Sequence, residues 1–445
     1  MNRSIVVSGA FWGLVTAAAL PITATAAESD EARQIRQEIQ QLRQEYEQRI
    51  QALEQKLQQS EAARAQATAA SPPSPASSSA SNNAFNPKIS LILQGSYADF
   101  GSDTEPDMPG FILGPETELR SDGFSLGETE LAIEANVDDK FHGWATIALE
   151  NEDGETVVAV EEAYLNTLTL PKGFALKFGR FFSDTGYLNH VHSHAWDFAD
   201  QPLVYRAFFA NQLKDDGLQL RWVAPTDLFF EAGTELLRGD GFPAGGEKRS
   251  GVNLSTVFAH VGGDVGTDHS WRAGISHINA DADDRRSGED IETSFTGDSD
   301  ITGLDLVWKW APDGNPAIRN FVFQTEYFVR DEDGSVVFDP DGVADTSTYD
   351  GKQKGFYVQG IYQWMPRWRV GLRYDRLSAN NSVPNPVAGT SLKTLADNRN
   401  DPERWSLMTD FSNSEFSRLR LQYNRDESRP GGEQDDQWLL QYIYS

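Results

Sequence analysis

The sequence lacks cysteine altogether, which excludes disulfide scaffolds, cysteine-based zinc sites and thiol chemistry. It is also short of basic side chains: across 445 residues, 38 Lys and Arg stand against 67 Asp and Glu, for a net charge of −29. Since phosphate backbones are bound by clustered Lys and Arg, we expect no nucleic-acid partner. Only 39% of the residues are hydrophobic, too few for a helical membrane protein, whereas glycine and aromatic residues are plentiful.

A short apolar run opens the chain. Arg3 precedes residues 5–20, which are mostly apolar and end at Pro21, and small residues follow at 24–27. This pattern is typical of a secretory signal peptide, so we assign residues 1–27 to one, with cleavage near the end of that stretch. A transmembrane anchor is the alternative, but the run is short and proline breaks it. The mature protein is therefore expected to be exported.

Residues 28–64 are rich in Glu, Gln and Arg, and their apolar residues recur every three or four positions. These apolar residues are Ala32, Ile35, Ile39, Leu42, Tyr46, Ile50, Leu53 and Leu57. The spacing predicts an α-helical coiled coil with one stutter. A single amphipathic helix on a surface is the alternative, but the apolar seam is narrow and favours burial against copies of itself. We therefore expect a homo-oligomer.

Residues 65–85 are dominated by Ala, Ser and Pro and cannot bury enough apolar surface to fold. They are predicted to form a disordered linker. Almost all of the negative charge therefore belongs to the C-terminal body, residues 86–445.

In this body the helical period disappears and alternation with a period of two begins, as in residues 130–137, 356–364 and 367–374. Such segments are strands with one apolar and one strongly polar face. We count about sixteen of them, beginning near Lys88, Ser125, Lys140, Thr156, Gly173, Asp215, Asp227, Gly251, Ser270, Asp300, Ile318, Gly355, Arg367, Arg404, Glu415 and Gln437.

The connections between strands alternate in length. Those after even-numbered strands are mostly tight turns, whereas those after odd-numbered strands are mostly long and charged. The long ones are residues 100–124, 182–214, 281–299, 331–352 and 378–403. Short turns on one rim and long loops on the other are typical of an outer-membrane barrel, whereas a soluble β-sandwich has no reason to sort loops in this way.

We therefore predict an all-β fold: a transmembrane antiparallel β-barrel of about 16 strands in the bacterial outer membrane, preceded by the coiled coil in the periplasm. The apolar faces would meet outer-membrane lipid and lipopolysaccharide, and the charged faces would line a water-filled lumen.

Three segments carry a family resemblance: Glu162-Ala163-Tyr164-Leu165, then Leu176 to Phe181, and an aromatic-rich final strand that ends one residue after Tyr444. With the signal, coiled coil and linker, the chain resembles the trimeric bacterial outer-membrane porins that carry an N-terminal periplasmic coiled coil. These include the phosphate-selective porin superfamily and its dicarboxylate-porin and siderophore-porin relatives. The resemblance implies a trimer but no particular solute.

The resemblance also implies that residues 182–214, after the fifth strand, fold into the lumen and narrow it. The predicted constriction residues in this segment are His190, His192, His194, Asp197, Asp200 and Arg206. Alternate spacing would put the three histidines on one side of an extended segment, where they could bind zinc, copper or nickel. A hydrogen-bonded loop without metal is the alternative.

Inward-facing charges are predicted to separate by sign, with acids on early strands and arginines on late ones. The predicted lumen-wall residues are Glu130, Glu134, Glu162, Arg367, Arg369, Arg373, Arg404, Arg418 and Arg420. Opposed walls of this kind orient polar solutes, although the charges could also simply balance one another. The acidic loops 100–124, 281–299 and 331–352 would attract cations and could hold calcium or magnesium.

The sequence thus favours a passive diffusion porin, and we find no motif that requires catalysis, so no enzyme is expected. The alternative is an outer-membrane protein that binds or takes up a metal or metal chelate through His190, His192 and His194. A third is a tether that links the outer membrane to peptidoglycan through the coiled coil. The transported solute and the ion selectivity are left open.

Overall fold

The computed structural model describes residues 87–445, with gaps at 103–107, 115–116, 118–121, 153–154, 247–250, 288–292, 340–341, 343, 385 and 387–389. The predicted signal peptide (1–27), coiled coil (28–64) and linker (65–85) lie outside the described residues. Within the described ranges, no helix has the length and apolar character needed to cross a membrane.

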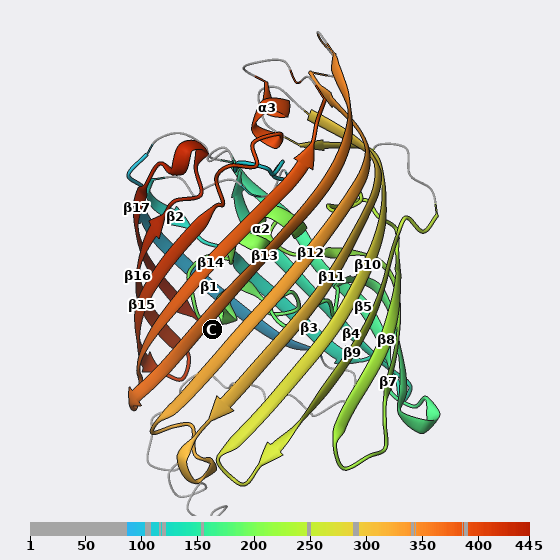
Figure 1. Cartoon of the computed structure of the whole chain (residues 1–445). Coiled ribbons are helices and arrows are strands. Elements are labelled where there is room, and N and C mark those ends of the chain that lie inside the picture. Colours follow the sequence, from blue (N-terminus) through green and yellow to red (C-terminus); the bar gives the residue numbers. More distant parts are fainter. Residues whose placement is uncertain are drawn as a thin grey trace, which may run out of the picture. The chain divides into compact units, whose positions relative to one another are not determined.

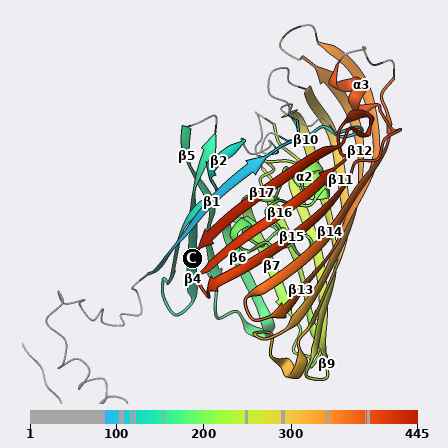
Figure 2. The same ribbon diagram turned by 90° about the vertical axis from the view of Figure 1, so that its left-hand side faces the viewer.

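The described chain folds into a closed antiparallel barrel, in which strands adjacent in sequence pair, except for β2 with β3, and the last strand pairs with the first (Figures 1 and 2). The first strands are β1 (Lys88–Asp99), β2 (Gly123–Leu126), β3 (Thr129–Asn136), β4 (Phe141–Glu152), β5 (Glu155–Thr167), β6 (Phe174–Phe182), β7 (Lys214–Val223), β8 (Phe229–Leu237) and β9 (Leu254–Val265). The others are β10 (His269–Ser287), β11 (Thr293–Trp310), β12 (Asn320–Phe338), β13 (Asp345–Met365), β14 (Trp368–Ser382), β15 (Glu403–Ser414), β16 (Ser417–Asp426) and β17 (Asp435–Tyr444).

Strands β2 and β3 form one barrel strand in two parts. Both pair with β1, and only Gly127 and Glu128 separate them. The seventeen strands of the described chain therefore build a wall of 16 barrel strands, which confirms the predicted fold class. The connections after β3, β7, β13 and β15 are short, as the sequence indicated, but the β4–β5 and β12–β13 connections on the other rim are short too.

Two of the predicted long loops are wrong, because residues 281–299 and 331–352 are mostly strand. The β10–β11 and β12–β13 hairpins continue through these segments, with Asp300 opposite Asp331 and Thr296 opposite Ser335. β-Branched residues such as Thr293, Val336, Val337 and Thr348 favour strands. The charge of these segments was interpreted as a sign of a loop, but the two hairpins pair with each other through β11 and β12, and many of the charged residues lie on the exposed face of this sheet. Figure 1 shows these strands as the tall side of the barrel.

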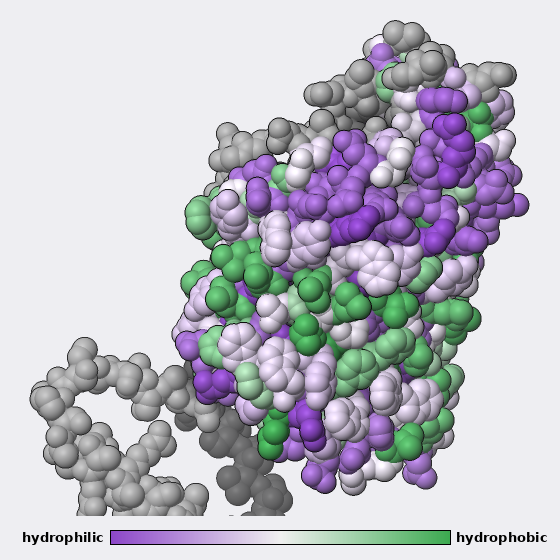
Figure 3. All heavy atoms as spheres, turned by 60° about the vertical axis from the view of Figure 1, so that its left-hand side comes forward, coloured by the Kyte–Doolittle hydropathy of each residue, from purple (hydrophilic) through white to green (hydrophobic). Residues whose placement is uncertain are grey.

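The outer wall carries an apolar belt. Large apolar side chains such as Leu91, Leu218, Leu304, Leu372 and Leu407 are exposed and alternate with buried residues along their strands. Figure 3 shows hydrophobic residues gathered in a band across the wall, with hydrophilic residues on the taller end. Such a band is what the hydrocarbon region of a membrane would cover.

The connection between β6 and β7, residues 183–213, lies inside the barrel. It contains the 3-10 turn η3 (Ser193–Ala195) and the helix α2 (Leu203–Phe209), whose residues are all buried. Figure 1 places α2 within the wall of strands, and its contacts are with β13 and β14. We call residues 183–213 the inner loop. Apolar residues of α2 pack against inward-facing Phe328, Tyr357 and Leu377, so the loop has a hydrophobic core of its own inside the barrel.

Further short helical segments lie in connections between strands. They are η2 (Pro171–Gly173), η4 (Pro312–Gly314), α3 (Ser391–Leu395) and η5 (Pro430–Gly432). The helix α3 packs Leu392 and Leu395 against Val336 and Tyr349, at the taller end of the barrel. It therefore covers part of the β12–β13 extension.

Candidate functional site

One carboxylate of the inner loop, Asp200, forms ion pairs with arginines of the late strands. Arg373 Nη2 donates to Asp200 Oδ1 over 2.7 Å, and Arg404 Nη1 lies 3.0 Å from Asp200 Oδ2. Gln422 and Asn424 also donate to this carboxylate. Burial alone would raise the pKa of Asp200, but Arg404 and Arg373 outweigh it and hold that pKa well below its usual value. Asp200 is therefore an ionised anchor between the loop and strands β14 to β16.

A second carboxylate of the loop, Asp197, accepts a hydrogen bond of 2.7 Å from Arg369, which also pairs with Asp410. Arg420 donates to the backbone oxygen of Trp196, and Arg418 donates to it as well. The predicted arginines of the late strands thus face inward and hold the loop.

Arg367 is the exception among these arginines, and its prediction as a lumen-wall residue was wrong. It lies in the tight turn between β13 and β14, is exposed, and has a positive φ of 74°. Its guanidinium donates to the backbone oxygen of Asn413. Arg367 and Arg369 are two residues apart and would face the same side of one strand. However, β14 begins only at Trp368, so Arg367 does not take part in its alternation.

Arg206 is not exposed to the lumen either. It is buried in α2, and its Nη2 donates to the backbone oxygen of Thr117 over 2.6 Å. Its guanidinium thus links the inner loop to the β1–β2 connection.

A third anchor is Glu326 of β12. Tyr205 and Tyr357 donate their hydroxyl groups to its carboxylate over 2.9 and 2.5 Å. The backbone N–H groups of Tyr187 and Leu188 donate to it over 3.0 Å each. The loop is therefore fixed to the wall on both sides of η3.

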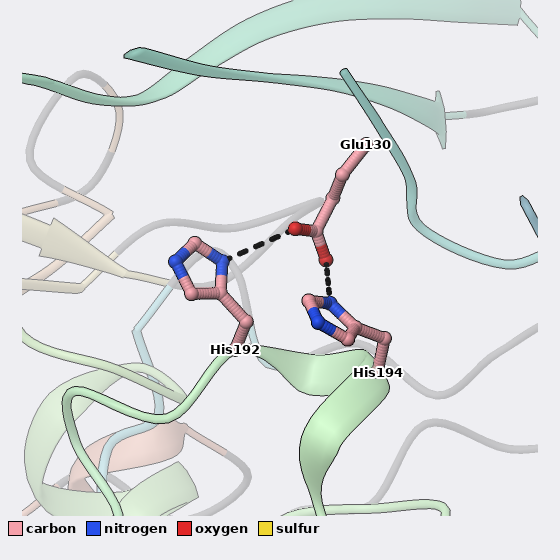
Figure 4. A group of neighbouring side chains, drawn as sticks. All are labelled: Glu130, His192 and His194. Carbon is pink, nitrogen blue, oxygen red and sulfur yellow. Dashed lines mark hydrogen bonds and ion pairs between the residues drawn. The ribbon is translucent and has the colours of Figure 1, made fainter. Parts of the chain in front are cut away.

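Glutamates of β3 and β5 contact the inner loop at two histidines. Figure 4 shows the Glu130 carboxylate between His192 and His194: His194 Nδ1 lies 2.7 Å from Oε1, and His192 Nδ1 lies 3.2 Å from Oε2. Glu162 Oε2 lies 3.0 Å from His192 Nε2. Burial lowers the pKa of His192, but the neighbouring carboxylates of Glu130, Glu161 and Glu162 outweigh it and raise that pKa to about 12.

The predicted alignment of three histidines on one side is wrong. His190 lies beside Asp184, with Nδ1 to Oδ1 at 3.8 Å, and against the ring of Tyr187, whereas His192 and His194 share Glu130. The reason is local: this segment is a series of turns that ends in η3, so alternate residues do not share a side.

Glu134, the third predicted acid of the early strands, lies at the end of β3. Its carboxylate pairs with Lys88 at 2.7 Å and is 4.0 Å from His142 Nε2. It is therefore separate from the pair formed by His192 and His194.

Glu161 was not predicted as a site residue from the sequence. Strand β5 carries a bulge, where Thr146 pairs with Glu162 but Ile147 pairs with Val160. Because the bulge accommodates one extra residue, both Glu161 and Glu162 are buried, whereas strict alternation would turn one of them outward. Two consecutive glutamates in an otherwise alternating strand were the only signal.

Four inward-facing basic residues were also missed: Lys177, Arg221, Arg272 and Lys309. They lie on β6, β7, β10 and β11, and Arg272 and Lys309 stand over the ring of Tyr187 in the inner loop. Each of them lies between two apolar residues that face outward. The alternation along those strands therefore already predicts that the basic side chain points into the barrel.

A protein of Aquifex aeolicus (strain VF5), described as an uncharacterized protein, is 34% identical over 377 residues, which cover 79% of this chain and 76% of that protein. The chain belongs to the same family. No known family model matches it.

Several outer-membrane proteins of known structure are similar in fold. OmpT of Vibrio cholerae, as a loop deletion mutant, is 12% identical, with a TM-score of 0.49 over 80% of this chain and 99% of that one. The outer membrane channel DcaP of Acinetobacter baumannii is 14% identical, with a TM-score of 0.48 over 81% and 97%. An anion-selective porin from Comamonas acidovorans is 10% identical, with a TM-score of 0.48 over 81% and 99%. The narrower resemblance to the phosphate-selective porin superfamily stays a prediction.

Proposed function

We propose that this protein is a porin of the bacterial outer membrane, through which small polar or charged solutes diffuse. The observation that carries the proposal is a closed barrel with an apolar belt outside and charged side chains inside, narrowed by the inner loop. Ionised groups are costly in hydrocarbon, so the inward direction of the charges requires water within the barrel.

The passage is proposed to run between the inner loop and the wall. Several charged side chains at this boundary are partly exposed although they lie within the barrel. Their exposed fractions are 16% for His192, 23% for His194, 23% for Asp197, 19% for Arg369 and 27% for Arg418. Water that reaches these groups shares the path that a polar solute would follow. The buried Arg206 is therefore left out of the proposed constriction.

The assembly is part of the same proposal. We infer a trimer in which the coiled coil of residues 28–64 extends into the periplasm, toward peptidoglycan, while lipid and lipopolysaccharide surround the belt. The narrow apolar seam of that segment supports self-association. No catalytic role is proposed.

Conductance across a planar lipid bilayer tests the function. Purified protein is expected to insert and to raise the ionic current in groups of three steps. Protein that inserts and carries no current would contradict the proposal.

The route can be tested because the chain has no native thiol. Asp197→Cys should be modified within the barrel by a charged, water-soluble thiol reagent, and the current through the same channel should fall on modification. Asp401→Cys is the matched control: Asp401 forms an exposed pair with Arg376, and its modification should leave the current nearly unchanged. Equal responses from the two variants would place the path elsewhere.

A further inference from the structure

We propose that Glu130, Glu161, His192 and His194 form a binding site for a first-row transition-metal dication such as zinc, inside the barrel. The site differs from the row of three histidines expected from the sequence. It takes two histidines from the inner loop and two glutamates from β3 and β5, and it excludes His190.

The spacing of the donor atoms supports the site. Four ligands about 2.1 Å from zinc at tetrahedral angles lie about 3.4 Å from one another. His192 Nδ1 lies 3.2 Å from Glu130 Oε2 and 3.4 Å from Glu161 Oε2. Ligand atoms of Glu130, His192 and His194 all lie within 4.8 Å of one another (Figure 4). Glu161 falls with Glu128 and Glu130 in a second group of the same spacing, so Glu130 is common to both groups.

The contact between Glu161 Oε2 and His192 Nδ1 supports the site as well. The two atoms form an ion pair at 3.4 Å, but neither makes a hydrogen bond among the described residues. Glu161 is only 4% exposed, so water does not readily solvate its carboxylate. A buried polar atom without a hydrogen bond is costly, and a cation between these two atoms would be coordinated by both.

Glu162 orients the ring of His192. Its Oε2 lies 3.0 Å from Nε2, on the side of the ring away from Glu130 and Glu161. A metal-binding histidine usually donates its other ring N–H to such an acceptor, which directs the remaining lone pair toward the ion. Glu162 is thus a positioning residue for His192.

The donor set selects the class of ion. Two imidazoles with two carboxylates suit zinc and its first-row neighbours, whereas calcium and magnesium prefer oxygen ligands alone. Two carboxylates balance the charge of one dication. His192 and His194 are partly exposed, so an ion in the lumen can reach them. A metal-bound imidazole nitrogen carries no proton, so zinc competes with protons at this site.

Calorimetry on the full-length protein in detergent micelles, stripped with a chelator, tests the site by titration with zinc chloride. We expect one zinc per chain, at least tenfold weaker binding in His194→Gln, and unchanged binding in the matched control His190→Gln. No binding by the unaltered protein, or equal affinities in the two variants, would overturn the proposal. So would calcium competing equally with zinc.

X-ray absorption at the zinc edge of the unaltered protein gives a second measurement that needs no variant. It should show two imidazole ligands together with oxygen ligands. An oxygen-only shell would overturn the assignment. Neither measurement depends on conductance, so the site and the channel can fail separately.

Discussion

At the scale of single residues, ion pairs between opposite elements decide where the inner loop lies. Asp200 is the clearest case, because Arg373 and Arg404 are almost fully buried and both face its carboxylate. Buried arginines need such a partner, since an unpaired buried charge is more costly than the pair is favourable. The loop and the basic wall are therefore held in place together.

Asp200→Asn should loosen this anchor. Removing the charge leaves the two arginines with less compensation, and we expect the free energy of unfolding to fall by about 3 kcal/mol. Thermal unfolding in detergent measures this loss, and single-channel current should rise as the loop moves away from the wall. Asp401→Asn, in the exposed pair with Arg376, is the control and should change stability by less than about 0.5 kcal/mol. Equal effects of the two changes would contradict the anchoring role.

At the scale of elements, irregularities in the strands matter as much as their alternation. The bulge in β5 brings Glu161 inward beside Glu162, and without it the acidic cluster would lose one carboxylate. The β10–β11 and β12–β13 hairpins instead continue regularly into the taller end of the barrel, where acidic residues face one another across the strands. Asp300 and Asp331 form one such pair.

Asp298→Asn should stabilise the barrel slightly. Asp298 lies opposite Asp333 on β12 and Asp281 on β10. Like charges directly opposite on paired strands repel, so removing one is expected to raise the free energy of unfolding by about 0.5 kcal/mol at low salt. The gain should shrink as salt screens the charges. Thermal unfolding at two salt concentrations measures both effects, with Asp313→Asn, in the β11–β12 turn, as the control. A loss of stability would show that Asp298 makes a favourable contact instead.

At the scale of the whole molecule, charge is distributed unevenly: charges of both signs face the lumen, and acidic residues gather at the taller end. Within the described residues, Glu130, Glu161 and Glu162 face the lumen on one side, whereas Arg369 and Arg418 face it from the late strands. The taller end carries the acidic hairpins. An electric field across the lumen acts on every solute that passes through. The strength of this field depends on charged side chains that are hydrated but held in place.

Arg418→Gln should therefore shift ion selectivity toward cations. Arg418 is 27% exposed within the barrel, so its charge acts on passing ions. The reversal potential in a potassium chloride gradient measures the shift. Arg367→Gln, which removes the same charge from an exposed turn, should shift it less. If the two shifts were equal, bulk surface charge rather than the lumen wall would set selectivity.

The alternation of apolar and polar residues was enough to predict the barrel, because it is a local property that strand geometry converts directly into an outer and an inner face. The count of strands, nearly all of their starts, and the inward direction of residues such as Arg373 and Arg404 follow from it. Only the tertiary structure decided which side chains meet. The contact of His192 with Glu130 joins a turn to a strand more than sixty positions away, and the burial of Glu161 depends on one extra residue in a ladder. Sequence periodicity describes residues that are close along the chain. These two contacts instead depend on residues far apart in sequence and on the register between strands.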